Sequence, residues 1–339
     1  MVTVDQLPMT MQAIRQTGYG DVSRWGVGEE AVPTPGPGRV LVRVEAAGVD
    51  QGTWHLLTGQ PYLLRLVFGL RTPKRVVPGL DLAGRVVAVG EGVSRISVGD
   101  EVFGIGEGSY AEYATALESK LERRPDCWTA TQAAAAPVSG LTAWQALHTA
   151  ARVASGQRVL VIGASGGVGS FAVQIAAAAG AQVTAVCSAA KADFVRSLGA
   201  ERVVDYRVQD VADLGVAYDV VLDISGRSTL RRLRRLTVPG GVVVLIGGDD
   251  KNPVFGPFGR SLRALAWTPA AGRRFVMLVT KEQYGALTEL ARLGRAGRLT
   301  PAVDRVYPLA EAAAAITVLD AGEVRGKLVL SVGPGTMAS

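Results

Sequence analysis

A carboxyl, an imidazole and a phenol follow one another within a short stretch, and each can hold or move a proton. They belong to Asp50, His55 and Tyr62. Asp50 could accept hydrogen bonds when ionised, act as an acid if burial raises its pKa, or cap a following helix. His55 could transfer a proton or fill a structural role, and Tyr62 could donate from its phenol or pack as an aromatic ring. We therefore predict catalytic candidates here, with the proton donor left open.

A second set of residues favours anion binding. The apolar run Val159–Ile162 is typical of a parallel strand covered on both faces, and a glycine turn and an alanine-rich helix follow it. Glycines allow a tight turn and a close approach to phosphates, and a helix N-terminus attracts negative charge. No Lys-Ser or Lys-Thr follows, so a P-loop is excluded. We predict a dinucleotide pyrophosphate site at Gly163, Ser165, Gly166, Gly167, Val168 and Gly169.

Strands and helices alternate after this turn, which predicts an α/β fold with a doubly wound parallel sheet. The expected strands are 182–187, 202–206, 218–224 and 241–246, and the expected helices are 191–198 and 230–236. Gly247 follows the fifth strand, at the carboxyl edge where such sheets contact a cofactor.

The sequence outside this region has a different pattern of short β-like runs and turns, which predicts a second, mostly β domain. Short β-like runs at 40–46, 85–89 and 101–103 are separated by Gly, Pro and Asp turns, and a helix is expected over 130–149. A strand, a helix and a strand at 300–305, 309–319 and 327–332 suit a return to that first domain. The Pro- and Gly-rich segment 252–271 could cap the cleft or form a dimer contact.

Composition narrows the class of protein. The chain has 339 residues, 48% of them hydrophobic, and no apolar run of the length that crosses a membrane. With no signal-peptide pattern and two distant cysteines, we expect a cytoplasmic protein without disulfides and without a membrane partner. The net charge of +6 includes the arginines of 230–236, whose leucine spacing indicates an amphipathic helix, so we expect no nucleic-acid partner.

Motifs along almost the whole chain resemble the medium-chain dehydrogenase/reductases, and within them the zinc-lacking, quinone oxidoreductase-like branch. They include 46–50 (AAGVD), 78–84 (PGLDLAG), 98–102 (VGDEV), 110–113 (YAEY), the glycine turn and 326–329 (GKLV). The resemblance implies a Rossmann domain inserted in a GroES-like, mostly β catalytic domain, a cleft between them and commonly a homodimer. The expected boundaries are 1–138 for the catalytic domain, 139–275 for the Rossmann domain, and 276–339 for its end and the return.

The resemblance also implies whether the chain binds a zinc ion. Zinc-dependent relatives place a cysteine, a His-Glu pair and a later cysteine or aspartate where this chain has Asp50, Leu80 with Asp81, and roughly Val138. Zinc favours cysteine and histidine ligands, and the chain has two of each, scattered. We therefore predict no metal, with Asp81 a buried, hydrogen-bonded carboxylate.

The expected cofactor is NADPH. The second strand ends in Cys187 and Ser188, where an NAD site usually has a carboxylate that would repel a 2′-phosphate. Lys191 and Tyr206 stand where similar relatives often hold that phosphate. The family match adds Thr142 and Lys327 to the predicted cofactor-binding residues.

A metal-free site lacks a strong Lewis acid, so an already activated acceptor is the easier substrate. We expect an NADPH-dependent reductase of quinones or α,β-unsaturated carbonyls, acting on a small molecule. Zinc alcohol dehydrogenases carry a proton-relay histidine at the position of His55, but the hydroxyl of that relay is replaced here by Gly52. A metal-free alcohol or carbonyl dehydrogenase, a biosynthetic tailoring reductase and a non-catalytic NADPH-binding sensor stay open.

Overall fold

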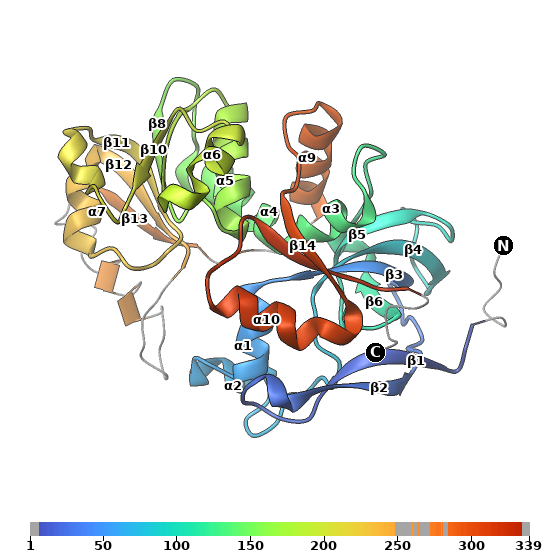
Figure 1. Cartoon of the computed structure of the whole chain (residues 1–339). Coiled ribbons are helices and arrows are strands. Elements are labelled where there is room, and N and C mark those ends of the chain that lie inside the picture. The colour runs from blue at the N-terminus through green and yellow to red at the C-terminus, as the bar shows by residue number, and fades with distance from the viewer. Residues whose placement is uncertain are drawn as a thin grey trace. The chain divides into compact units, whose positions relative to one another are not determined.

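The computed structural model describes residues 7–247, 259–260, 263–264, 272–278, 280 and 284–333 (Figure 1). The chain divides into two compact units, of which the second, Gly140–Lys281, interrupts the first, Met1–Ser139 with Glu282–Ser339. Most of segment 252–271 lies outside the described residues, and with it the expectation of a cap or dimer contact there.

The second unit is built on a parallel sheet in the order β10-β9-β8-β11-β12-β13. Its strands are β8 (Arg158–Ile162), β9 (Gln182–Cys187), β10 (Arg202–Asp205), β11 (Tyr218–Asp223), β12 (Thr237–Leu245) and β13 (Arg274–Met277). In chain order this is 3-2-1-4-5-6, the order of dinucleotide-binding folds, and it confirms the predicted doubly wound sheet.

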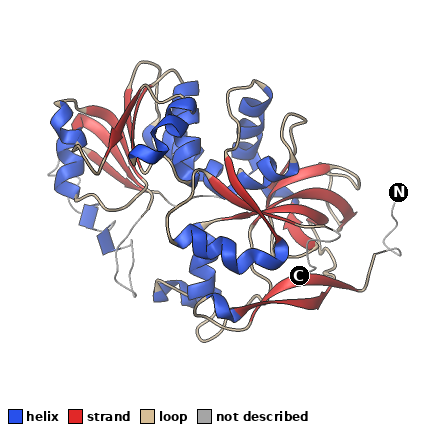
Figure 2. Cartoon of the chain, viewed as in Figure 1, coloured by secondary structure: helices blue, strands red, loops and turns tan. Residues whose placement is uncertain are grey.

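Helices cover both faces of this sheet, as the blue helices beside the red strands show (Figure 2). Its helices are η5 (Gln145–Ala151), α5 (Gly167–Ala178), η6 (Ala189–Lys191), α6 (Ala192–Ser197), η7 (Val211–Leu214) and α7 (Leu230–Leu236). In α7, Leu233 and Leu236 are buried in the core while Arg231, Arg234 and Arg235 are exposed, which confirms the amphipathic helix.

The first unit holds a seven-stranded sheet, β14-β15-β3-β4-β5-β7 with β6 beside β3, and a separate pair, β1-β2. Its strands are β1 (Thr10–Gln16), β2 (Trp25–Ala31), β3 (Arg39–Val49), β4 (Asp81–Val89), β5 (Glu101–Ile105), β6 (Tyr113–Leu117), β7 (Leu121–Arg123), β14 (Val303–Pro308) and β15 (Lys327–Ser331). β15 pairs antiparallel with β3, Leu328 facing Val49, so the late strand does return to the first unit.

The described helices of the first unit are short, except α9 with 12 residues. They are η2 (Val22–Arg24), α1 (Gln51–Thr58), η3 (Tyr62–Leu64), α2 (Arg65–Phe68), η4 (Glu118–Lys120), α3 (Ala130–Ala135), α9 (Tyr284–Arg295), η8 (Leu309–Glu311) and α10 (Ala312–Asp320). One core cluster joins buried side chains of β3, β4, β15 and α10, among them Val42, Leu82, Leu330 and Ile316.

The single helix expected over 130–149 is wrong. The chain forms α3, then α4 (Pro137–Trp144), then the π-helical η5. Pro137 has no N–H to bond back into α3, and its ring crowds the preceding turn, so α3 ends and a new helix starts at the proline.

Candidate functional site

The glycine turn lies between β8 and α5 and forms an open cradle of backbone. Gly163 has φ +90°, a left-handed conformation that favours glycine, and a Cβ on Gly169 would stand 2.2 Å from the Gly163 carbonyl oxygen. A Cβ on Gly166 would meet only that same oxygen, at 3.9 Å. Two of the glycines are thus needed by the turn itself, while Gly166 leaves space free beside the chain.

That space adjoins the first turn of α5, a helix of 12 residues. Gly166 is its N-cap and has no side chain to cap the helix. The first N–H groups of a helix have no partner within it, and they carry partial positive charge. Gly167 and Val168 open the helix, and Ser165 is buried just before it. The arrangement fits a pyrophosphate.

Strand register brings the other predicted cofactor residues to the same sheet edge. Ile162, the last residue of β8, pairs with Val186 of β9 and with Asp223 of β11, which pairs in turn with Leu245 of β12. The residues after these positions, 163–169, 187–188 and 247, therefore share the carboxyl edge. Gly247 is tightly held there, since a Cβ on it would lie 1.8 Å from the Ile224 carbonyl oxygen.

The end of β9 carries a small neutral pair beside basic side chains. Cys187 and Ser188 are buried. Burial raises the pKa of the Cys187 thiol, with the charge of Asp205 adding to the rise and those of Lys191 and Arg196 opposing it. These two cations therefore lie within electrostatic reach of the strand end.

Tyr206, the residue after β10, also lies near the end of β9. Its backbone N–H donates to the Cys187 carbonyl at 3.3 Å, and its ring is 55% exposed. The Arg207 guanidinium lies 5.8 Å from the centre of that ring. The structure thus places Lys191 and Tyr206, the residues predicted to hold the 2′-phosphate, near the neutral pair at the end of β9, with the carboxylate of Asp205 also close by.

Thr142 and Lys327 take different places. Thr142 lies in α4, nearly buried, with its hydroxyl 3.3 Å from that of Thr280 in the same second unit. Lys327 starts β15 in the first unit, where 2% of its side chain is exposed and its Nζ donates to Asp81 Oδ2 at 3.1 Å.

Asp50 is the N-cap of α1, which confirms that alternative for it. Its Oδ1 accepts from the Thr53 backbone N–H at 2.9 Å. The side chain is buried, and its Oδ2 has no hydrogen-bond partner among the described residues. A buried carboxyl oxygen without a donor is costly when ionised, which makes it a place where a proton or a ligand donor would fit.

His55 is a neutral base by its surroundings. Its Nδ1 lies 2.6 Å from the Gln60 carbonyl oxygen, and because a carbonyl only accepts, the ring proton is on Nδ1. Burial lowers the pKa of His55, against the opposing effects of that hydrogen bond and of the Asp50 charge. The remaining nitrogen, Nε2, is therefore an acceptor at neutral pH.

The environment of Tyr62 is more exposed than those of Asp50 and His55. Its side chain is 43% exposed, and the Arg65 guanidinium stacks 4.6 Å from its ring centre. The same guanidinium stacks 4.5 Å from the ring centre of Tyr19.

A buried polar cluster around Asp81 was only partly foreseen. Asp81 is fully buried, accepts the Val138 N–H at 2.8 Å and receives Lys327 on its other oxygen, as the predicted structural role requires. Burial raises the pKa of Asp81 to about 7, with the Lys327 charge opposing and the Asp50 charge adding to the rise. Burial thus outweighs the Lys327 ammonium, so the Asp81 carboxyl still holds a proton in part of the molecules near neutral pH.

Two further groups were missed. The Tyr110 hydroxyl is buried beside Asp50 and Asp81, donates to the Gly48 carbonyl at 3.2 Å, and has its pKa raised well above 10, first by burial. Asp223 ends β11, fully buried, with the Arg260 guanidinium 2.5 Å away. Tyr110 occurs in a quoted family motif, and the position of Asp223 at a strand end was the available signal for it.

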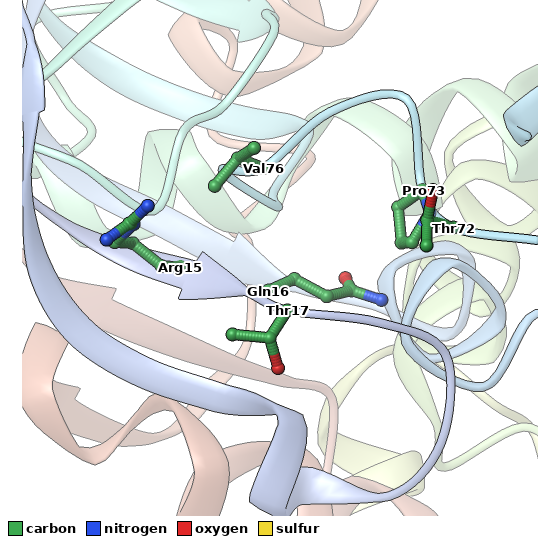
Figure 3. Close-up of a pocket in the computed structure, with 6 residues that line it drawn as sticks. All are labelled: Arg15, Gln16, Thr17, Thr72, Pro73 and Val76. Carbon is green, nitrogen blue, oxygen red and sulfur yellow. The ribbon is translucent and has the colours of Figure 1, made fainter.

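Each unit has a surface hollow among its described residues. One, of about 350 Å³, lies in the first unit and is lined by Arg15, Gln16, Thr17, Thr72, Pro73 and Val76, none of them a predicted catalytic residue (Figure 3). The other, of about 520 Å³, follows β11 and is lined by residues 226–230 with Arg260 and Arg263.

The described part of the chain has neither a metal-binding cluster nor a membrane-spanning helix. No group of three or more His, Cys, Asp or Glu side chains there is placed to hold a metal ion. No helix among those residues has the length and apolar character needed to cross a membrane.

The similarity of this chain to known proteins extends over nearly its whole length. The family models described as alcohol dehydrogenase GroES-like domain and zinc-binding dehydrogenase match residues 36–126 and 198–330. The chloroplastic quinone-oxidoreductase homolog of Spinacia oleracea is 32% identical over 94% of this chain and 98% of its own. The 2-methylene-furan-3-one reductase of Solanum lycopersicum is 30% identical over 96% and 80%. The solved quinone oxidoreductase of Coxiella burnetii has a TM-score of 0.85 at 26% identity, covering 96% of this chain and 100% of its own.

Proposed function

Because the chain belongs to the quinone-oxidoreductase-like branch of the medium-chain dehydrogenase/reductase superfamily, we propose that it reduces quinones or α,β-unsaturated carbonyls with NADPH and without zinc. The names of two similar proteins, a quinone-oxidoreductase homolog and a methylene-furanone reductase, support this acceptor class.

The end of β9 is the observation that carries the cofactor choice. A carboxylate at this place would accept from ribose hydroxyls and repel a 2′-phosphate. Here the buried Cys187 and Ser188 offer no charge, and Lys191 lies within electrostatic reach. A phosphate with nearly two negative charges gains most from such a cation and from the exposed Tyr206 hydroxyl. The nearby carboxylate of Asp205 weakens the preference.

The donor set at Asp81 argues against a zinc ion. Both carboxyl oxygens are engaged, one by the Val138 N–H and the other by the Lys327 ammonium. A divalent cation there would stand beside a buried positive charge, with no thiolate or imidazole offered by Leu80 or Val138. The residues present do not fit the metal.

NADPH, when bound, supplies a hydride to the acceptor, and a proton must also reach the reduced oxygen or carbon. The backbone of Gly166 and Gly167 would hold the pyrophosphate, and Lys191 with Tyr206 would hold the 2′-phosphate. We assign the proton handling to Asp50, because its Oδ2 is buried and has no hydrogen-bond partner among the described residues, which leaves that oxygen open to a proton or a ligand donor. His55 accepts rather than donates at neutral pH.

Steady-state oxidation of NADPH against a panel of quinones and enones tests the proposal, with a chelator added in a parallel series. We expect turnover with activated acceptors that the chelator leaves unchanged. Loss of activity on chelation, restored by zinc, would contradict metal independence. No turnover with any activated acceptor would reject the proposed function.

One observation favours a second candidate, a metal-free alcohol dehydrogenase. Neutral His55 with an accepting Nε2 suits removal of a proton from an alcohol. Oxidation of primary and secondary alcohols with NADP⁺ separates the two, since only the second candidate turns over with unactivated alcohols.

A further inference from the structure

Residues 61–76 display apolar side chains that the fold does not use. Six large hydrophobic side chains in this stretch are exposed by 41–68%: Tyr62, Leu63, Leu66, Val67, Leu70 and Val76. Neither η3 nor α2, the helical turns that carry four of them, has a buried residue. Single exposed hydrophobic side chains are ordinary, but six within one stretch of 16 residues indicate a surface that contacts something apolar. We call residues 61–76 the apolar segment.

Positive charge surrounds these side chains. The sequence from Gln51 to Leu80 contains no Asp or Glu, whereas the apolar segment contains Arg65, Arg71, Lys74 and Arg75. Arg75 pairs with Glu107, and Arg65 is engaged with the Gly59 and Thr58 carbonyls. Arg71 and Lys74 are exposed, and neither pairs with a carboxylate within the described ranges. The segment is therefore both apolar and unbalanced in charge.

The backbone holds this display in a fixed shape. The Tyr19 hydroxyl donates to the Gly69 carbonyl at 2.8 Å, and the Lys74 N–H donates to the Phe68 carbonyl at 2.8 Å. The hollow of Figure 3 takes Thr72, Pro73 and Val76 from the same segment, so its last residues flank a concave surface. A preordered apolar segment loses little conformational entropy on docking.

We propose that the apolar segment docks the protein reversibly onto an anionic lipid surface. Apolar side chains that enter the boundary between headgroups and acyl chains, with basic side chains at headgroup level, are the pattern of interfacial binding. A second copy of the chain is a poor occupant, because two such segments face to face would bring like charges together. The expectation of no membrane partner rested on the lack of a spanning helix, which does not test surface contact.

Co-sedimentation of the full-length protein with phosphatidylglycerol vesicles, and separately with phosphatidylcholine vesicles, tests this proposal. We expect binding to the first, weakened by salt, and little binding to the second. Each basic side chain near an anionic surface contributes about fivefold to the partition coefficient, so Arg71→Glu with Lys74→Glu should lower binding at least about 25-fold. Leu66→Ser with Val67→Ser should lower it without any change of charge.

Matched controls lie in the second unit. Arg231→Glu with Arg235→Glu changes the net charge equally at two exposed arginines of α7, and Val208→Ser alters a side chain that is 82% exposed. Both should bind vesicles as the unaltered protein does, and circular dichroism checks that every variant is folded. Equal loss in the charge controls, or no binding of the unaltered protein to phosphatidylglycerol, overturns the proposal. A lower oligomeric state of Leu66→Ser with Val67→Ser in light scattering assigns the segment to contact between copies and also overturns it.

Discussion

Alanine substitutions at Gly166 and Gly169 distinguish a role in cofactor binding from a role in the folding of the turn, and Gly18 provides a control. Gly166→Ala places a methyl where the nearest atom, the Gly163 oxygen, lies 3.9 Å away, with φ −85° and ψ −174° that alanine accepts. Gly169→Ala places one 2.2 Å from that oxygen and 2.7 Å from two backbone atoms of Ala164. Gly18→Ala is the control, since no atom lies within 4 Å of its Cβ position.

The expected magnitudes follow from these contacts. Alanine is a poorer N-cap than glycine but restricts the unfolded chain, so Gly166→Ala should change the free energy of unfolding by less than about 1 kcal/mol. The backbone atoms that crowd Gly169 cannot rotate away, so that variant should lose about 1–3 kcal/mol or more. A methyl at Gly166 that removes one charge-assisted hydrogen bond to a phosphate costs about 1.5–3 kcal/mol of binding, roughly 10- to 150-fold in Kd.

Thermal melting and fluorescence titration with NADPH measure the two quantities on the same samples. We expect Gly166→Ala to melt as the unaltered protein does and to bind NADPH at least tenfold more weakly. Gly169→Ala should melt earlier, and Gly18→Ala should change neither quantity. Unaltered NADPH affinity in Gly166→Ala would place the pyrophosphate elsewhere and refute the reasoning.

Three further predictions concern charges. Lys191→Ala should weaken NADPH about 10- to 100-fold and NADH little, and titrations showing equal loss for both would reject the phosphate site. Asp50→Asn should keep NADPH affinity and lower turnover about 10²- to 10⁴-fold; unchanged kinetics would remove Asp50 from the mechanism. The folded pKa of Asp81, about 7, exceeds its ordinary 3.8, so the stability due to its proton is present below that ordinary value and is lost as pH rises through 7. The Asp81→Asn variant lacks this loss of stability with rising pH. The difference in melting temperature between the unaltered protein and the variant should therefore narrow from about pH 5 to about pH 8, and a constant difference would contradict the raised pKa of Asp81.

Local patterns were enough to predict five of the six described strands of the parallel sheet, β8 to β12, because each of these is an apolar run bounded by turns, whereas β13 was not predicted. The glycine turn is equally local. The buried cluster was harder, since Asp81 and Lys327 are 246 residues apart and meet only once β15 has paired beside β3. The tautomer of His55 depends on the Gln60 carbonyl at 2.6 Å, a contact set by the turn after α1 that residue types do not encode.

The pairing of β15 with β3 also constrains the order in which the protein can be completed during synthesis. The second unit, Gly140–Lys281, is continuous in sequence and can close as soon as its last strand leaves the ribosome. The first unit cannot, because its sheet lacks β14 and β15, and Asp81 lacks its ammonium, until residue 331 has been made. For most of translation, therefore, the edge of β3 has no β15 to pair with, and the Asp81 carboxyl has no Lys327 ammonium to pair with. Nascent chains that stall before Lys327 should be the ones that chaperones retain.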